Sequence, residues 1–149
     1  MRSVQKNLRI PVETVRSIEK LAEAEERDFS RTTNELLEEA IRMRRCPGIV
    51  FTAGRAGRRA TIAGSGIDVF EVVAKSRAVR GNLQRLGRYY HWLAETQLRA
   101  ALDYYRLYPV EVDARLRREA RLVPRVVYAR HPQVEPPEPP SPRARRARR

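Results

Sequence analysis

The spacing of apolar residues at the start of this 149-residue chain predicts one short strand followed by two helices. Apolar and polar side chains alternate over residues 3–11, except that Lys6 falls on the apolar face, and this period of two is typical of a half-buried strand. Residues 12–27 and 31–45 instead carry apolar side chains at helical spacing, with Ser30 as the expected N-cap of the second helix. The side chains expected to face inward on that helix are Leu36, Leu37, Ala40 and Ile41.

The middle of the chain predicts a hairpin and then more helices. Residues 49–66 are rich in glycine, which indicates short strands joined by tight turns. The strands are expected at 49–52 and 60–63, and helical spacing returns over 67–78, 82–90, 97–108 and 112–122. We therefore expect a mainly α fold whose second module spans residues 46–122.

The end of the chain has a different composition. From residue 132 onward it consists largely of proline, arginine and glutamate and has no aromatic residue. Such a segment cannot bury enough apolar surface to fold, so we expect a Pro/Arg-rich disordered tail over 123–149. The tail ends in an arginine cluster over 143–149, which is expected to contact DNA non-specifically or to reach a partner protein.

The chain is strongly basic. It has 31 Lys and Arg against 18 Asp and Glu, a net charge of +13, and all but three of the basic residues are arginine. Arginine binds phosphates and base edges through paired hydrogen bonds, so this composition predicts a polyanionic partner. The charge is uneven, however: the net values are +1 over residues 1–45, +8 over 46–129 and +4 over 130–149.

Other function classes are excluded or disfavoured by composition. No stretch approaches 18 uncharged apolar residues, so no membrane association is expected, and no signal peptide is expected at the charged N-terminus. The single cysteine, Cys46, excludes an internal disulfide and fits a reducing, cytoplasmic location. One cysteine with His91 and His131 forms neither a catalytic set nor a metal site. We therefore expect no enzymatic activity, metal or cofactor.

The predicted N-terminal strand has no obvious partner strand nearby in its own chain. Because an isolated strand leaves its backbone groups unpaired, the simplest solution is a homodimer in which two copies pair antiparallel. The resulting two-stranded ribbon is narrow enough for the major groove of DNA. It would present Gln5, Asn7 and Arg9, side chain types that read adenine and guanine. The alternative is that the strand joins the sheet of the following segment.

These residues resemble the ribbon-helix-helix family, the fold of the Arc and MetJ repressors and of many bacterial antitoxins. The resemblance rests on Gln5-x-Asn7-Leu8-Arg9-Ile10-Pro11 and on Phe29-Ser30 followed by residues 34–41. It implies that residues 1–45 form a dimeric DNA-binding domain. Gln5, Asn7 and Arg9 would then read bases, while Ser30 and Arg31 at the start of the second helix hold phosphate. Lys6, Thr32 and Thr33 depart from the family's usual apolar residues.

Residues 46–118 are similar to family 433 of the domains of unknown function. The similarity is carried by the glycine-rich run over 57–69, by Leu83-x-x-Leu86-x-x-Tyr89 and by Trp92-Leu93 with the sequence over 97–105. It implies a small helix-turn-helix-like module that accompanies nuclease toxins of the PIN-like class. Asp68 and Gly66 stand where that family usually has proline and arginine. The glycine-rich run itself lacks the Gly-Lys-Ser/Thr ending of a phosphate-binding loop. Its arginines, Arg55, Arg58 and Arg59, are expected to make a secondary contact with nucleic acid or with an acidic partner.

Together these features predict the antitoxin of a toxin–antitoxin system, acting also as an autorepressor. The N-terminal dimer would bind double-stranded operator DNA, and residues 46–122 would neutralise a PIN-like ribonuclease toxin. Two alternatives remain open. One is a stand-alone transcriptional regulator in which both modules bind DNA and no toxin exists, and the other is a sequence-tolerant architectural binder driven by arginine charge.

Overall fold

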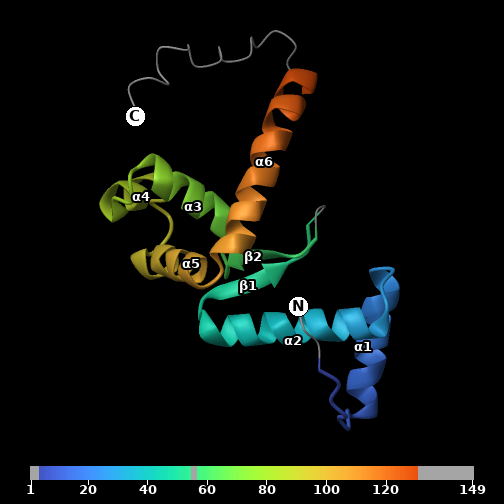
Figure 1. The fold of residues 1–149 in the computed structure, drawn as a ribbon. Helices are drawn as coiled ribbons and strands as arrows, with labels where there is room; N and C mark the ends of the chain where they lie inside the picture. The colour runs from blue at the N-terminus through green and yellow to red at the C-terminus, as the bar shows by residue number, and fades with distance from the viewer. Residues whose placement is uncertain (1–3, 55–56, 131–149) are drawn as a thin grey trace. The chain divides into compact units, whose positions relative to one another are not determined.

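The computed structural model describes residues 4–54 and 57–130, with side chains as far as Arg121. The fold is mainly helical, as expected, and the described residues include one small antiparallel sheet of two strands (Figure 1). The chain divides into an N-terminal unit that ends at Gly66 and a C-terminal unit that starts at Ile67. In the part of the chain that is described, no helix combines the length and apolar character needed to cross a lipid bilayer.

The N-terminal unit contains two helices followed by a hairpin. Its elements are α1 (Val12–Ala24), α2 (Phe29–Arg45), β1 (Ile49–Thr52) and β2 (Arg59–Ile62). Helix α1 packs against α2 through a face on which Ile18 and Ala22 are buried, and α2 packs against β1. The hairpin, expected to belong with the helices that follow it, is therefore grouped with α2 instead.

Helix α2 starts earlier than expected. Ser30 is not its N-cap: the cap is Asp28, whose Oδ1 accepts a hydrogen bond of 2.8 Å from the backbone N–H of Arg31. An aspartate at this position satisfies one of the helix's free N–H groups and places a negative charge at the positive end of the helix dipole. Phe29 and Ser30 therefore lie inside the first turn.

The connection between the two helices contains a residue in the left-handed region. Glu26 has φ of 51°, and it follows the C-cap of α1. The N–H of Arg27 bonds to the carbonyl of Ala22, and the N–H of Glu26 bonds to the carbonyl of Glu23. This hydrogen-bond pattern is a Schellman motif, in which the left-handed position is usually glycine because a Cβ is unfavourable there.

Replacing Glu26 with glycine is therefore expected to stabilise the protein, by about 0.5–1 kcal/mol, because it removes this left-handed strain. The measurement is the free energy of unfolding in urea. Glu23→Gly is the matched control, since Glu23 lies in the last turn of α1 and should lose about 1 kcal/mol. If both variants lose stability, the strain at Glu26 is not significant.

The hairpin pairs β1 with β2 in an antiparallel register that places Ile49 opposite Ile62 and Thr52 opposite Arg59. Ile49 and Ile62 are almost fully buried, and the hydroxyl oxygens of Thr52 and Thr61 lie 2.8 Å apart. The first strand matches the sequence expectation, whereas the second begins one residue earlier than expected. The glycine-rich segment thus forms a hairpin, as its glycines predicted.

The C-terminal unit is a helical assembly centred on α3. Its elements are α3 (Val69–Ala78), α4 (Leu83–Tyr89), α5 (Glu95–Leu107) and α6 (Pro109–Arg130). Helix α3 packs against each of the other three, and α5 also packs against α6. The most deeply buried side chains of this unit are Val69, Val72, Val73, Leu86, Leu98, Ala101 and Tyr104.

The last helix differs most from the sequence expectation. Proline is favourable at the first position of a helix, because it has no N–H and an N–H at that position would have no partner inside the helix. Helix α6 begins at Pro109 and continues to Arg130, rather than running from 112 to 122. Residues 123–130, expected to be the start of a disordered tail, are therefore helical. The arginine cluster at 143–149 lies outside the described residues.

Candidate nucleic-acid interface

The segment predicted to read DNA forms neither helix nor strand in the single chain. Residues 4–9 are exposed, and Ile10 is half-buried. Among the described residues, none forms a hydrogen bond with the backbone of residues 4–10. The alternative in which this segment joins the following sheet does not occur, since that sheet contains only β1 and β2. The segment's backbone donors and acceptors are thus available to a second chain.

The exposed side chains of this segment follow the alternation in the sequence. Val4 and Leu8 expose 73% and 72% of their surface. Gln5, Asn7 and Arg9 are also exposed. A pleated conformation would place Val4, Lys6 and Leu8 on one face and Gln5, Asn7 and Arg9 on the other.

Helix α2 leaves a second apolar surface uncovered. Leu37 and Ile41 were expected to face a core, but in the single chain each is about half exposed, at 50% and 52%. They lie four residues apart and therefore share one face of the helix. The expected inward face is therefore wrong for the single chain: Ala40 is also exposed, and the buried residues of α2 are Thr32 and Glu39.

The amino end of α2 holds the two residues expected to bind phosphate. Ser30 and Arg31 are both exposed and lie in the first turn. The N–H of Arg31 already donates to Asp28, whereas the backbone N–H groups of Phe29 and Ser30 have no acceptor among the described residues. A phosphate here would meet two free N–H groups and the Arg31 side chain but also the negative charge of Asp28.

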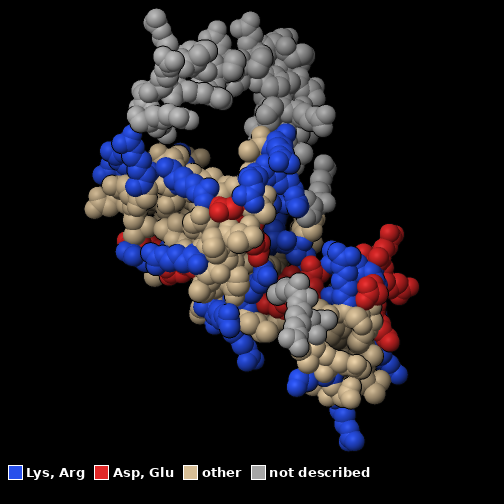
Figure 2. Space-filling view, viewed as in Figure 1, with Lys and Arg blue, Asp and Glu red and all other residues tan. Residues whose placement is uncertain are grey.

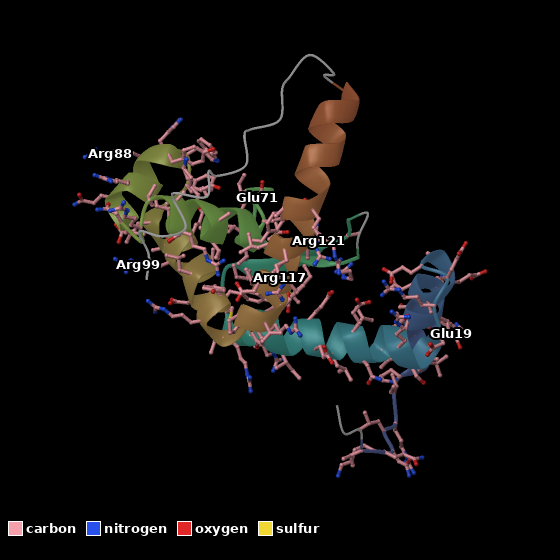
Figure 3. The ribbon with its side chains drawn as sticks, turned by 45° about the horizontal axis from the view of Figure 1, so that its top comes forward. Glu19, Glu71, Arg88, Arg99, Arg117 and Arg121 are labelled. Atoms are coloured by element: carbon pink, nitrogen blue, oxygen red, sulfur yellow. The ribbon has the colours of Figure 1, made fainter. Side chains whose placement is uncertain are left out.

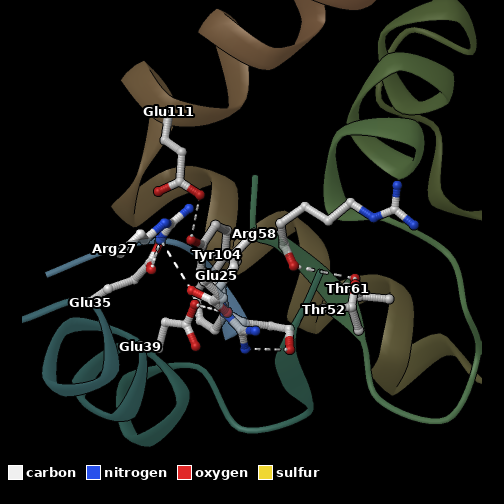
Figure 4. A network of polar contacts seen from close by, with 11 residues as sticks. Glu25, Arg27, Glu35, Glu39, Thr52, Arg58, Thr61, Tyr104 and Glu111 are labelled. Carbon is white, nitrogen blue, oxygen red and sulfur yellow. Dashed lines mark hydrogen bonds and ion pairs between the residues drawn. The ribbon is translucent and has the colours of Figure 1, made fainter. Parts of the chain in front are cut away.

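Arg58 has a structural environment that the sequence did not indicate. Its guanidinium forms an ion pair with Glu39 of α2 and donates a hydrogen bond of 3.1 Å to the carbonyl of Phe51 (Figure 4). The Glu39 side chain is only 8% exposed. The hydrogen bond to Glu39 raises the pKa of Arg58 above its usual value, and the charge of Glu39 acts in the same direction. Arg58 therefore links the hairpin to α2 and can reach a phosphate only by leaving a buried carboxylate unpaired.

The other two arginines of this group are placed differently. Arg59 starts β2 and is half-buried, with its guanidinium against Gly54, where an added Cβ would lie 3.1 Å from its terminal nitrogen. Arg55 lies outside the described residues. The structure thus brings no cluster of three free arginines together in the described part of the hairpin.

Ion pairs that join distant residues were missed by the sequence analysis. Arg27, expected only to mark the break between helices, pairs with Glu35 and lies 3.5 Å from Glu25 (Figure 4). In the C-terminal unit, Arg77 donates hydrogen bonds to Asp113 and to the hydroxyl of Tyr105, at 2.6 and 2.5 Å. The bond from Arg77 lowers the pKa of the Asp113 carboxyl. No local spacing rule relates such residues, so only the fold could show these contacts.

Comparisons with known proteins identify no relative for this chain: no family model, curated protein sequence or solved structure matches it. Within the described residues, no group of three His, Cys, Asp or Glu side chains is placed to hold a metal ion.

Proposed function

We propose that this protein is a homodimeric DNA-binding regulator whose N-terminal segment reads a double-stranded operator. The observation that carries the proposal is the exposed, unpaired segment over residues 4–10, with apolar and polar side chains on alternate positions. Pairing of two such segments would satisfy their backbones, cover Val4 and Leu8, and leave Gln5, Asn7 and Arg9 facing outward. This is the arrangement that the resemblance to ribbon-helix-helix proteins implies.

The exposed face of α2 supports the same proposal. Leu37 and Ile41 belong to the same unit as the N-terminal segment, and in the proposed dimer the second copy would cover both apolar surfaces. Burying a side chain of this size contributes about 1.5–3 kcal/mol. Covering these four side chains with a second copy would therefore stabilise a dimer.

Arg9→Ala is expected to weaken binding to the preferred operator by about 1–3 kcal/mol, because one arginine can form paired hydrogen bonds with guanine. The preferred sequence can be selected from a random duplex library, and affinity measured on it and on unrelated duplex DNA. The matched control is Arg16→Ala, which removes an exposed arginine of α1 that pairs with Glu13. Equal losses on all DNA sequences would contradict base reading by Arg9.

The antitoxin role stays a prediction. Most of the excess positive charge lies beyond residue 45, and a positively charged inhibitor suits the carboxylate-lined site of a PIN-like ribonuclease. Co-expression with a nuclease encoded beside this gene tests that role. Restored growth supports an antitoxin, whereas continued toxicity with intact operator binding supports the stand-alone regulator.

A further inference from the structure

One continuous segment of the C-terminal unit is strongly basic, although Glu71 and Glu95 lie just outside it in the sequence. Residues 75–94 contain one lysine, four arginines and no Asp or Glu, and they cover the end of α3, all of α4 and the turn before α5. Lys and Arg side chains gather over α3 and α4 on the face that Figure 2 shows. This region therefore has a strong local attraction for anions.

Two of these arginines have no partner in the described part of the chain. Arg85 and Arg88 are exposed and lie on one face of α4, and neither guanidinium forms an ion pair or hydrogen bond with a described residue. Figure 3 shows Arg88 projecting from α4. By contrast, Arg99 and Arg106 of α5 pair with Glu95 and Asp103. The α4 arginines are thus left for an external anion.

Two exposed aromatic rings stand beside these arginines in the sequence. Tyr89 and Trp92 expose 51% and 56% of their surface. Both rings contact buried Tyr90 in near-perpendicular geometry, with centroids 4.8 and 5.7 Å from it. The Nζ of Lys75 lies 3.6 Å from the centroid of the Tyr89 ring. The rings are therefore fixed by the core on one side and remain half in solvent, next to a cation.

We propose that this aromatic-basic surface, formed by Lys75, Arg85, Arg88, Tyr89 and Trp92, binds single-stranded nucleic acid. Exposed aromatic rings stack on unpaired bases, and neighbouring cations neutralise the phosphates between them. Duplex DNA offers the same phosphates but keeps its bases stacked inside the helix. A surface that bound only phosphate would need basic side chains but no exposed rings. A single strand can contact both the basic and the aromatic side chains.

The chain provides its own reporter for this surface, because Trp92 is its only tryptophan. An oligothymidylate and an oligouridylate of about 12 nucleotides, long enough for one binding surface, are titrated into the full chain. We expect Trp92 fluorescence to be quenched on binding, and the tighter of the two probes identifies DNA or RNA as the ligand. The matched duplex should quench much less.

Substitutions then test which side chains carry the binding, measured by anisotropy of a labelled oligonucleotide. Trp92→Leu should weaken binding about 5-fold or more, while Trp92→Phe, which keeps a ring, should retain most of it. Arg85→Gln with Arg88→Gln should also weaken binding. The control Arg99→Gln with Arg106→Gln removes the same charge from the same unit and should leave affinity within about twofold.

Several outcomes would overturn the proposal. These are no quenching by either probe, equal quenching by the duplex, or equal losses in the two arginine pairs, which would indicate general charge attraction. Loss of binding in Trp92→Phe as large as in Trp92→Leu would also argue against stacking. A variant with Gln5→Ala and Arg9→Ala should bind the single strand normally, so this result does not depend on whether the N-terminal unit reads operator DNA.

Discussion

Replacing Val4 and Leu8 together with aspartate is expected to convert the proposed dimer into monomers and to abolish sequence-specific binding to the operator. Both residues are about 70% exposed in the single chain. In the proposed ribbon they lie on the face that the second copy covers. The dimer would lose four apolar contacts of about 1.5 kcal/mol each, roughly 6 kcal/mol, which weakens association on the order of 10⁴-fold. Four buried carboxylates would weaken it further.

The chain offers a close control for this experiment. Leu107 and Val110 are the same two residue types, with exposed fractions of 55% and 78%, but they lie in the C-terminal unit. Replacing this pair with aspartate should leave the dimer intact. Mass from light scattering distinguishes one chain of 17.3 kDa from a dimer of twice that mass. A wild-type monomer at micromolar concentration, or a dimer unaffected by the Val4 and Leu8 changes, would contradict the proposed ribbon.

Operator binding should fall with the dimer because the reading face needs two strands. One segment with an unpaired backbone has no fixed pleat, and so it cannot hold Gln5, Asn7 and Arg9 at a common spacing along the groove. The monomeric variant should still bind DNA weakly, through charge, with little preference for sequence. The variant should therefore lose its preference for the operator sequence and its dimeric mass together.

The sequence predicted the helices well because each one repeats apolar residues at a spacing of three or four positions, which is a local signal. Apolar residues at helical spacing over 12–27 predicted α1, although Leu21 of that stripe is exposed, and the glycine turns identified the hairpin. The errors concern positions where two local signals compete. In Asp28-Phe29-Ser30 either polar residue is a good cap, and Asp28 is used. Likewise α3 begins at Val69, with Asp68 as its N-cap, rather than at residue 67.

The candidate site was only partly predictable. The spacing of apolar residues indicates which face of a helix is apolar, but it does not indicate which segment packs against that face. Leu37 and Ile41 have the spacing of a core stripe, yet one chain leaves them half exposed. Glu39 shows the opposite error: its position suggests solvent, but it is buried against an arginine 19 residues away. Neither fact follows from local periodicity, since burial depends on which distant segment packs against each face.

Arg58→Ala is expected to destabilise the protein by about 3 kcal/mol and to leave nucleic-acid affinity nearly unchanged. The substitution would leave the carboxylate of Glu39 buried without its partner, and a buried charge that loses its partner typically costs about 3–5 kcal/mol. Arg58 itself is 26% exposed, so the lower end of that range applies. Arg16→Ala, which breaks the exposed pair with Glu13, should cost no more than about 1 kcal/mol.

A double replacement separates the charge pair from the packing. Arg58→Met with Glu39→Leu keeps the apolar volume and removes both charges, so it should recover most of the stability lost in Arg58→Ala. Urea unfolding measures the three stabilities, and binding to duplex DNA is measured alongside. If Arg58→Ala instead keeps full stability and loses DNA affinity, then Arg58 is a nucleic-acid contact, as its sequence context indicated. Loss of stability alone identifies it as the link between the hairpin and α2.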